Sequence, residues 1–150
     1  MAETEQKRLS QDSGLPEGTL FPQTEFVNWD GAIVRPSMGP GIKVFVFVSV
    51  YCTFCIDLLP HLAGMQREFE LPFRIFSTGD REDHEEMVAY FNWSFPVLAV
   101  TSLDIEERLR ITHMPFLMLI DEQGYIMSKS VIYTHEDFAL FMRRFRESSQ

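Results

Sequence analysis

The chain contains little cysteine and little positive charge, and each shortage excludes a class of protein. Its 150 residues include two cysteines, which are too few for a framework of disulfide bonds. Thirteen lysines and arginines stand against 22 aspartates and glutamates, which gives a net charge of −9. Nucleic acids and anionic membrane surfaces are bound through basic patches. We therefore expect neither of them as a partner.

Long hydrophobic runs are also missing. No run approaches the length of a transmembrane helix, and residues 1–14 lack the apolar core of a signal peptide. The chain as written is therefore expected to be cytoplasmic and to have no transmembrane segment. Residues 1–14 are polar and show no hydrophobic period, so we predict a disordered tail there. Residues 15–150 are long enough for one domain with its own core.

The two cysteines occur as Cys52-Thr53-Phe54-Cys55, a spacing that can supply half of a zinc site. A closed structural zinc site needs four ligands. The four histidines are scattered, with no ligand-pair spacing, at His61, His84, His113 and His135. We therefore expect no metal and no cofactor, and we interpret the pair as reactive thiols.

The stretch from Lys43 to Phe69 organises the rest of the chain. Val44–Val50 is an apolar run suited to a strand buried on both faces. After the cysteines, apolar residues recur at helical spacing as far as Phe69, around a bend predicted at Pro60. The cysteines thus lie where a strand enters a helix. The free amides at a helix N-terminus stabilise a thiolate, which is the form that attacks disulfides.

Strands and helices alternate along the remaining sequence. Asp30-Gly31 predicts a hairpin between two short strands, 25–29 and 32–34. Further strands are predicted over 73–77, 96–100, 116–120 and 125–131. Helices are predicted over 81–92 after an Asp80 cap, over 102–109 after a Ser102 cap, and after a Thr134 cap near the end. This order indicates an α/β fold, a central mixed sheet with helices on both faces.

The order of these features resembles the thioredoxin superfamily, and within it the TlpA/ResA-like thiol-disulfide oxidoreductases. The resemblance covers about residues 15–146. The matching residues are Cys52-Thr53-Phe54-Cys55, Pro60, the run 95–98, Met114-Pro115 and the turn 120–124. The resemblance implies a thioredoxin-like fold that begins with an N-terminal β-hairpin.

Roles for individual residues follow from the resemblance. Cys52 resembles the attacking thiol, and Cys55 resembles the resolving thiol that breaks the mixed disulfide. Pro115 matches the family's cis-proline, and the backbone of Met114 would pair with an extended substrate segment. Tyr51 stands where a tryptophan is common, and with Phe54 and Met114 it could form an apolar rim for the partner.

Several positions depart from the family's pattern. No histidine lies between the cysteines, which favours a reducing or intermediate potential of about −270 to −200 mV. Two acids of the family are replaced: Val46 stands at one position and Leu58 at the other. Proton transfer therefore lacks its usual acid, and His113, two residues before Pro115, is a candidate relay, with an ordinary loop histidine as the alternative.

These observations predict a thiol-disulfide oxidoreductase that reduces or exchanges disulfides in a partner protein. The expected partner carries a disulfide or a dithiol, and the chain itself is expected to be a monomer. The resemblance also allows an extracytoplasmic location, because the branch is largely exported. The alternative function is a thioredoxin-like interaction or redox-sensing module without turnover.

Overall fold

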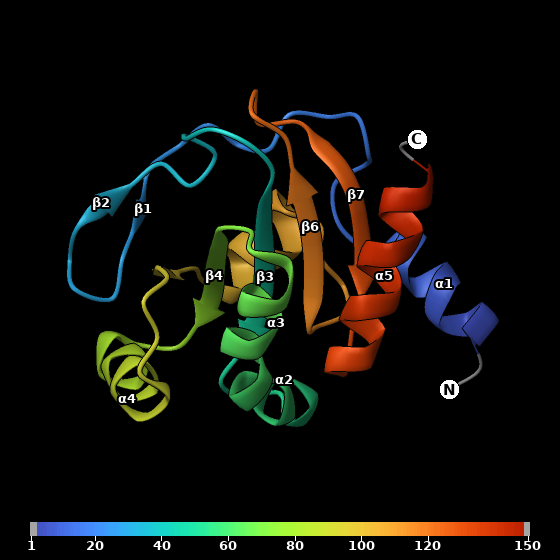
Figure 1. Ribbon diagram of the computed structural model, residues 1–150. Helices are drawn as coiled ribbons and strands as arrows, with labels where there is room; N and C mark the ends of the chain where they lie inside the picture. The colour runs from blue at the N-terminus through green and yellow to red at the C-terminus, as the bar shows by residue number, and fades with distance from the viewer. Residues whose placement is uncertain (1–2, 149–150) are drawn as a thin grey trace.

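A five-stranded mixed sheet forms the centre of the computed structural model, which describes residues 3–148 (Figure 1). The strand order is β5-β4-β3-β6-β7. Strands β4 and β5 run parallel to β3, whereas β6 and β7 form the antiparallel part. The strands are β3 (Lys43–Ser49), β4 (Phe73–Thr78), β5 (Val97–Ala99), β6 (Phe116–Ile120) and β7 (Ile126–Val131). A separate hairpin pairs β1 (Phe26–Val27) with β2 (Ile33–Val34), as Asp30-Gly31 predicted.

Helices cover both faces of this sheet, which confirms the predicted fold class. In Figure 1, α3 and α5 lie in front of the sheet and η2 lies behind it. The helices are α1 (Glu3–Asp12), α2 (Thr53–Leu58), α3 (Leu62–Phe69), α4 (Arg81–Phe91) and α5 (His135–Ser148), with the shorter turns η1 (Leu59–His61) and η2 (Asp104–Arg108). None of them has the length and apolar character needed to cross a bilayer, within residues 3–148.

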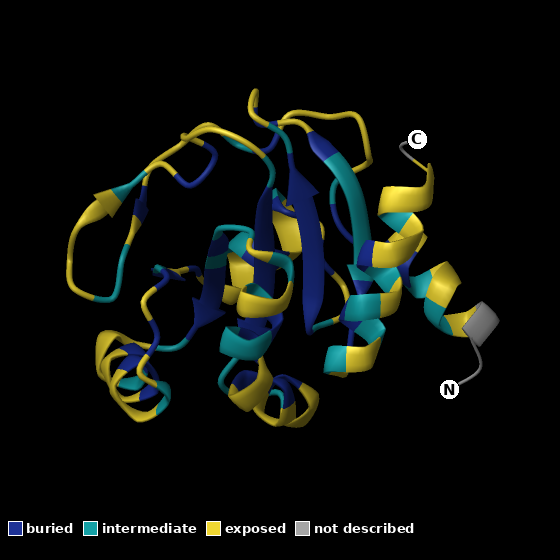
Figure 2. Ribbon diagram, in the orientation of Figure 1, coloured by how far each residue is buried: buried dark blue, intermediate teal, exposed yellow. Residues whose placement is uncertain are grey.

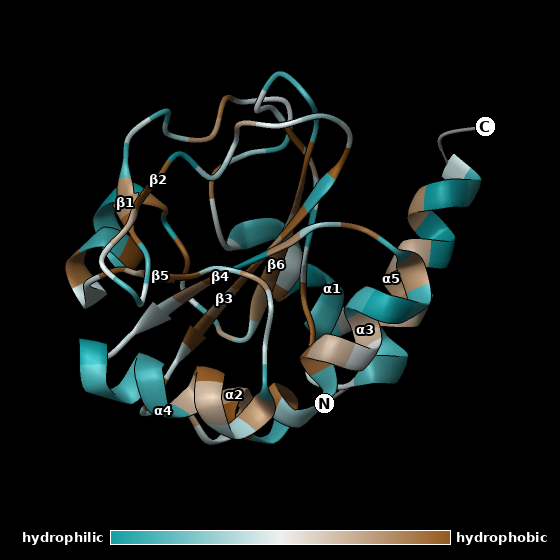
Figure 3. Cartoon of the chain, turned by 60° about the vertical axis from the view of Figure 1, so that its left-hand side comes forward, coloured by the Kyte–Doolittle hydropathy of each residue, from teal (hydrophilic) through white to brown (hydrophobic). Residues whose placement is uncertain are grey.

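The sheet separates two hydrophobic cores. One lies under α2 to α5 and contains Leu62, Met65 and Phe138; the other lies under η2 and the N-terminal segment. In the second core, Phe47 stacks on Phe76 with ring centroids 4.8 Å apart. Figure 2 shows the central strands in the colour of buried residues, and Figure 3 shows β3 as hydrophobic. Strands buried on both faces explain why β3 and β6 are continuous apolar runs.

The helix after the cysteines is bent where Pro60 predicted. Helix α2 ends at Leu58, the turn η1 contains Pro60, and α3 resumes at Leu62. Proline has no backbone N–H to donate, so the regular hydrogen-bond ladder is interrupted there. Farther on, Asp80 caps α4 through a capping box with Asp83, as predicted, and Thr134 caps α5.

The prediction of a disordered tail over residues 1–14 is wrong for the residues that the structure describes. Residues 3–12 form α1, which packs on β7. The Val131 N–H donates to Ser10 Oγ at 2.9 Å, and Gln6 Nε2 donates to the Val131 carbonyl at 3.2 Å. Strand β7 is at the edge of the sheet, where backbone groups lack a partner strand. Polar side chains of α1 form hydrogen bonds with those backbone groups. The helix therefore packs on the sheet without the hydrophobic period by which amphipathic helices are recognised. Residues 1–2 lie outside the described part of the chain.

The Ser102 cap is also a wrong prediction. Thr101 occupies the cap position, since its Oγ1 accepts a hydrogen bond from the Asp104 N–H at 3.0 Å. The Asp104 carboxylate accepts one from the Thr101 N–H at 3.1 Å in return. The segment that follows, η2, has π-helical hydrogen bonding. Serine is the slightly better cap residue, but Thr101 lies three residues before Asp104, so its reciprocal capping box with that acid decides the position.

Candidate active site

One edge of the sheet gathers the segments that carry the candidate site. Strand β3 ends at Ser49, three residues before Cys52, and the parallel strand β4 ends beside it at Thr78. Strand β6 is antiparallel to β3 and therefore begins at this edge, directly after Pro115. Strand β7 is antiparallel to β6, so it ends there, with Val131 opposite Phe116. Residues far apart in the sequence thus meet at the end of β3.

Cys52 is the N-cap residue of α2. The Cys55 N–H donates a hydrogen bond to Cys52 Sγ at 3.2 Å, and the Cys52 thiol donates one to the Met114 carbonyl at 3.6 Å. Its own N–H donates to the Ser49 carbonyl at 3.1 Å, which fixes the turn out of β3. The side chain is half-buried, so a partner can reach the sulfur. This arrangement directs an amide donor at the atom on which negative charge would develop.

Cys55 is fully buried one turn farther along the helix. Both cysteines are free thiols in this structure. Burial raises the pKa of the Cys55 thiol well above its ordinary value, and the hydrogen bond with Cys52 raises this pKa further. Leu58 and Val46, at the two positions where the resemblance implies acids, are buried in the same core as Cys55.

The predicted substrate-binding residues lie around Cys52. The Met114–Pro115 peptide bond is cis, as the resemblance implied, and the Met114 carbonyl is the group that contacts Cys52. Tyr51 is 85 % exposed and Phe54 60 % exposed, on either side of Cys52. Exposed aromatic side chains of this size are available to a partner's apolar groups.

His113 lies in the loop that leads to the cis bond, and it is exposed. Its Nδ1 lies 2.9 Å from Thr112 Oγ1, which holds the ring against its neighbour in the loop. The relay role that we assigned to it stays a prediction. Asp57, next to Leu58, is exposed and does not take the place of the missing acid.

Tyr133 belongs to the site and was missed by the sequence-based reasoning. Its ring packs on that of Phe54 with centroids 5.1 Å apart. Burial raises the pKa of Tyr133, and negative charge at Asp137 and at Cys52 raises it further. The topology could have revealed it, because Tyr133 follows the end of β7 and this end lies at the edge that carries Cys52.

A cavity of about 380 Å³ lies on the Met114 side of the dithiol. Ser49 and Thr78 line it, and their hydroxyl groups are joined by a hydrogen bond of 2.8 Å. Glu106 of η2 also lines it, so a carboxylate from a distant segment faces this space. Within residues 3–148, no three histidine, cysteine or acidic side chains are close enough to hold a metal ion.

The chain is similar in sequence to two methylamine utilization proteins named MauD. It is 23 % identical to that of Methylorubrum extorquens over 128 residues, and 25 % identical to that of Methylophilus methylotrophus over 142 residues. These alignments cover 83 % and 91 % of this chain. They span 62 % and 65 % of the length of the relatives, so this chain corresponds to a part of each. No family model matches the sequence.

Several solved structures match the chain over nearly their whole length. A putative thiol:disulfide interchange protein DsbE of Chlorobium tepidum superimposes with a TM-score of 0.73 at 17 % identity. The superposition covers 89 % of this chain and 97 % of that one. The thioredoxin domain of a thiol-disulfide oxidoreductase of Bacteroides vulgatus superimposes with a TM-score of 0.70 at 19 % identity, covering 87 % of this chain and 98 % of that one. A thio-disulfide isomerase of Thermus thermophilus superimposes with a TM-score of 0.67 at 20 % identity, covering 87 % of this chain and 97 % of that one. The chain therefore has the thioredoxin-like fold that its sequence predicted.

Proposed function

We propose that this chain is a thiol-disulfide oxidoreductase that reduces or exchanges disulfides in a partner protein. The observation that carries the proposal is the asymmetry of the dithiol. Cys52 is accessible, caps a helix and accepts a hydrogen bond from the Cys55 N–H, whereas Cys55 is buried one turn behind it. A reactive outer thiol and a shielded inner thiol are what a two-step exchange needs.

The exchange proceeds in two steps in which atoms and electrons balance. The Cys52 thiolate attacks one sulfur of the partner's disulfide, which forms a mixed disulfide and releases the other partner sulfur as a thiolate. Cys55 then loses its proton and attacks Cys52 Sγ, which forms the Cys52–Cys55 disulfide and releases the partner's second thiolate. Two electrons pass to the partner, and a dithiol donor returns them to this chain.

The groups around the dithiol support this sequence of events. The Met114 carbonyl contacts the Cys52 thiol, so an extended partner segment paired with the Met114 backbone would bring its disulfide to Cys52. Tyr51 and Phe54 flank Cys52 as exposed apolar surface. The N-terminal hairpin also supports assignment to the TlpA/ResA-like branch.

The direction of electron transfer is part of the same proposal. Thr53-Phe54 contributes no histidine between the cysteines, which supports a reductant rather than a strong oxidant.

We also propose an extracytoplasmic compartment for the chain. A secreted disulfide oxidoreductase of Mycobacterium tuberculosis is among the similar structures, with a TM-score of 0.66. This likeness supports an extracytoplasmic location, which fractionation of cells producing the natural gene product would test.

The roles of the thiols are tested by comparing wild-type protein with Cys52→Ser and Cys55→Ser. With dithiothreitol as electron donor, we expect wild type to accelerate insulin reduction and Cys52→Ser to be inactive. Cys55→Ser should accumulate a mixed disulfide with insulin, because the resolving thiol is missing, and Cys52→Ser should accumulate none. Equal rates for wild type and Cys52→Ser would instead favour a redox-sensing module without turnover.

A further inference from the structure

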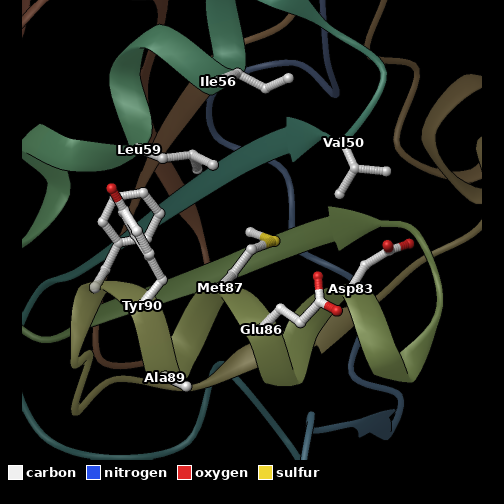
Figure 4. A pocket seen from close by; sticks show the side chains of 9 residues that line it. Val50, Ile56, Leu59, Asp83, Glu86, Met87, Ala89 and Tyr90 are labelled. Carbon is white, nitrogen blue, oxygen red and sulfur yellow. The ribbon is translucent and has the colours of Figure 1, made fainter.

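A groove of about 740 Å³ lies between α2 and α4 (Figure 4). Leu59 of η1 and Met87 of α4 face each other across it, and both are almost fully buried, at 7 % and 9 % exposure. Val50, at the end of β3, closes one end. The interior of the groove is therefore apolar.

The borders of the groove expose apolar side chains that the core does not use. Ile56 of α2 is 49 % exposed and Tyr90 of α4 is 83 % exposed. Tyr90 is supported from behind by Phe91, with ring centroids 4.8 Å apart in a T-shaped pair. Large apolar side chains grouped around a hollow mark a surface for another molecule more often than single exposed ones do.

The groove lies next to the cysteines along the chain. Val50 precedes Cys52 by two residues, and Ile56 directly follows Cys55. A molecule held in the groove would therefore contact the same helix that presents Cys52. This continuity joins the groove to the site of the proposed exchange.

The charge along the groove is of one sign. Asp83 and Glu86 of α4 line it, and no lysine or arginine does so among the described residues. The Asp83 carboxylate accepts a hydrogen bond from the Asp80 N–H in the cap of α4, whereas the exposed Glu86 carboxylate makes no hydrogen bond or ion pair within residues 3–148. The arginine nearest along α4, Arg81, is paired with Glu85 at 3.0 Å. The Glu86 carboxylate is thus available to a cation from outside.

We propose that this groove docks a segment of the partner protein that is apolar in its centre and flanked by lysine or arginine residues. The proposal rests on the proposed function, since it gives the chemistry of the partner whose disulfide Cys52 attacks. Apolar side chains would enter between Leu59 and Met87, and a basic side chain would pair with Glu86. A groove between two helices suits an amphipathic helix laid into it. A second copy of this chain, with a net charge of −9, is a poor match for an acidic border.

The test uses two synthetic amphipathic peptides without cysteine. Both carry leucines along one face; one has lysines at its flanks and the other has glutamates at the same positions. Reduced protein carrying ¹³C-labelled isoleucine and methionine methyl groups is titrated with each peptide. We expect the lysine peptide to shift the Ile56 and Met87 methyl signals to saturation and the glutamate peptide to leave them unchanged.

Two charge-reversal variants locate the interaction. Glu86→Lys should weaken binding of the lysine peptide about three- to tenfold, the loss expected from one exposed ion pair replaced by a repulsion. Glu107→Lys makes the same change in net charge on η2, across the sheet, and should bind as wild type does. Four outcomes would each overturn the docking proposal. Both peptides could shift the two methyl signals to saturation, or neither peptide could shift them. The two variants could bind the lysine peptide with equal affinity, or the same signals could shift because the protein associates with itself.

The reduction of a small neutral disulfide, bis(2-hydroxyethyl) disulfide, separates this proposal from the proposed function. It has no apolar segment and no charge, so the groove plays no part in its reduction. A wild-type protein that reduces it but binds neither peptide overturns the docking proposal alone. A wild-type protein that binds the lysine peptide but does not reduce the small disulfide overturns the proposed function, and with it the role of the docked molecule as a substrate.

Discussion

The two sulfur atoms of the dithiol have opposite surroundings, and this difference sets what each can do. Cys52 has an amide donor, a backbone acceptor and solvent access. Cys55 has hydrocarbon around it, with Leu58 one turn ahead on the same buried side of the helix. Desolvation disfavours the thiolate, so we expect the second step of the proposed exchange to be limited by removal of the Cys55 proton.

We predict that resolution of the mixed disulfide by Cys55 is slow near pH 7 and accelerates with rising pH. Below the raised pKa of Cys55, its thiolate fraction increases about tenfold per pH unit. Leu58→Glu supplies a general base beside the thiol and should accelerate resolution most at low pH. It should also lower the free energy of unfolding by about 1–3 kcal/mol, because an acid is buried in place of a hydrocarbon.

Stopped-flow measurement of resolution from pH 6 to 9, starting from a preformed mixed disulfide, checks this prediction. Asp57→Glu is the matched control, since residue 57 is exposed on the same turn. If Leu58→Glu resolves no faster than this control at pH 6, proton transfer at Cys55 is not the slow event.

At the residue scale, sequence reasoning worked where chemistry is local. The Cys52–Cys55 spacing, the Asp80 cap and the bend at Pro60 depend on neighbours within a few positions, and the structure has all three. The place of Tyr133 in the candidate site depends on its contact with Phe54, which lies 79 positions earlier in the sequence. That contact requires the strand order, which no local pattern contains.

At the scale of elements, α1 shows that a helix can be held by polar contacts to a sheet edge. Ser10 is buried against β7 and accepts the hydrogen bond of the Val131 N–H. Farther along, Lys129 Nζ donates to the Ser13 carbonyl at 2.8 Å, and the Thr112 N–H donates to Ser13 Oγ at 2.9 Å. These contacts join residues more than 90 positions apart, which is why composition alone predicted disorder.

We predict that Ser10→Ala destabilises the protein by about 1–3 kcal/mol, because the buried Val131 N–H then has no acceptor. Gln11→Ala, at the exposed neighbouring position, should change the free energy of unfolding by less than about 0.5 kcal/mol. The urea midpoints of the two variants provide the measurement. Equal midpoints for Ser10→Ala and wild type would show that α1 is not coupled to β7 in solution.

At the scale of the whole molecule, the mixed sheet explains how residues far apart in the sequence assemble the candidate site. The direction of each strand brings Ser49, Thr78, Pro115 and Val131 to one edge. The strand runs were predictable because they are apolar and bounded by turn residues. The cavity beside Met114 and the groove between α2 and α4 were not, because each is formed by side chains from several elements.

The buried thiol also makes the stability of the whole protein depend on pH. Cys55 has a raised pKa in the folded state and its ordinary value, about 8.5, in the unfolded state. Above that pH the unfolded chain has lost a proton that the folded protein still holds. Stability linked to Cys55 is therefore complete below about pH 8.5 and decreases as the pH rises above it.

We predict that reduced wild-type protein loses up to about 1.4 kcal/mol of unfolding free energy per pH unit above pH 8.5 through this one group. Lys43 and Lys129 have pKa values lowered by burial, so they release protons first in the folded state and act in the opposite direction near pH 10. The difference between wild type and Cys55→Ala isolates the cysteine, because both proteins share these lysines. Urea unfolding of the two reduced proteins from pH 7 to 10 should give curves that converge as the pH rises. Parallel curves would mean that the Cys55 thiol ionises as readily in the folded protein as in the unfolded chain, which its burial among Leu58 and Val46 contradicts.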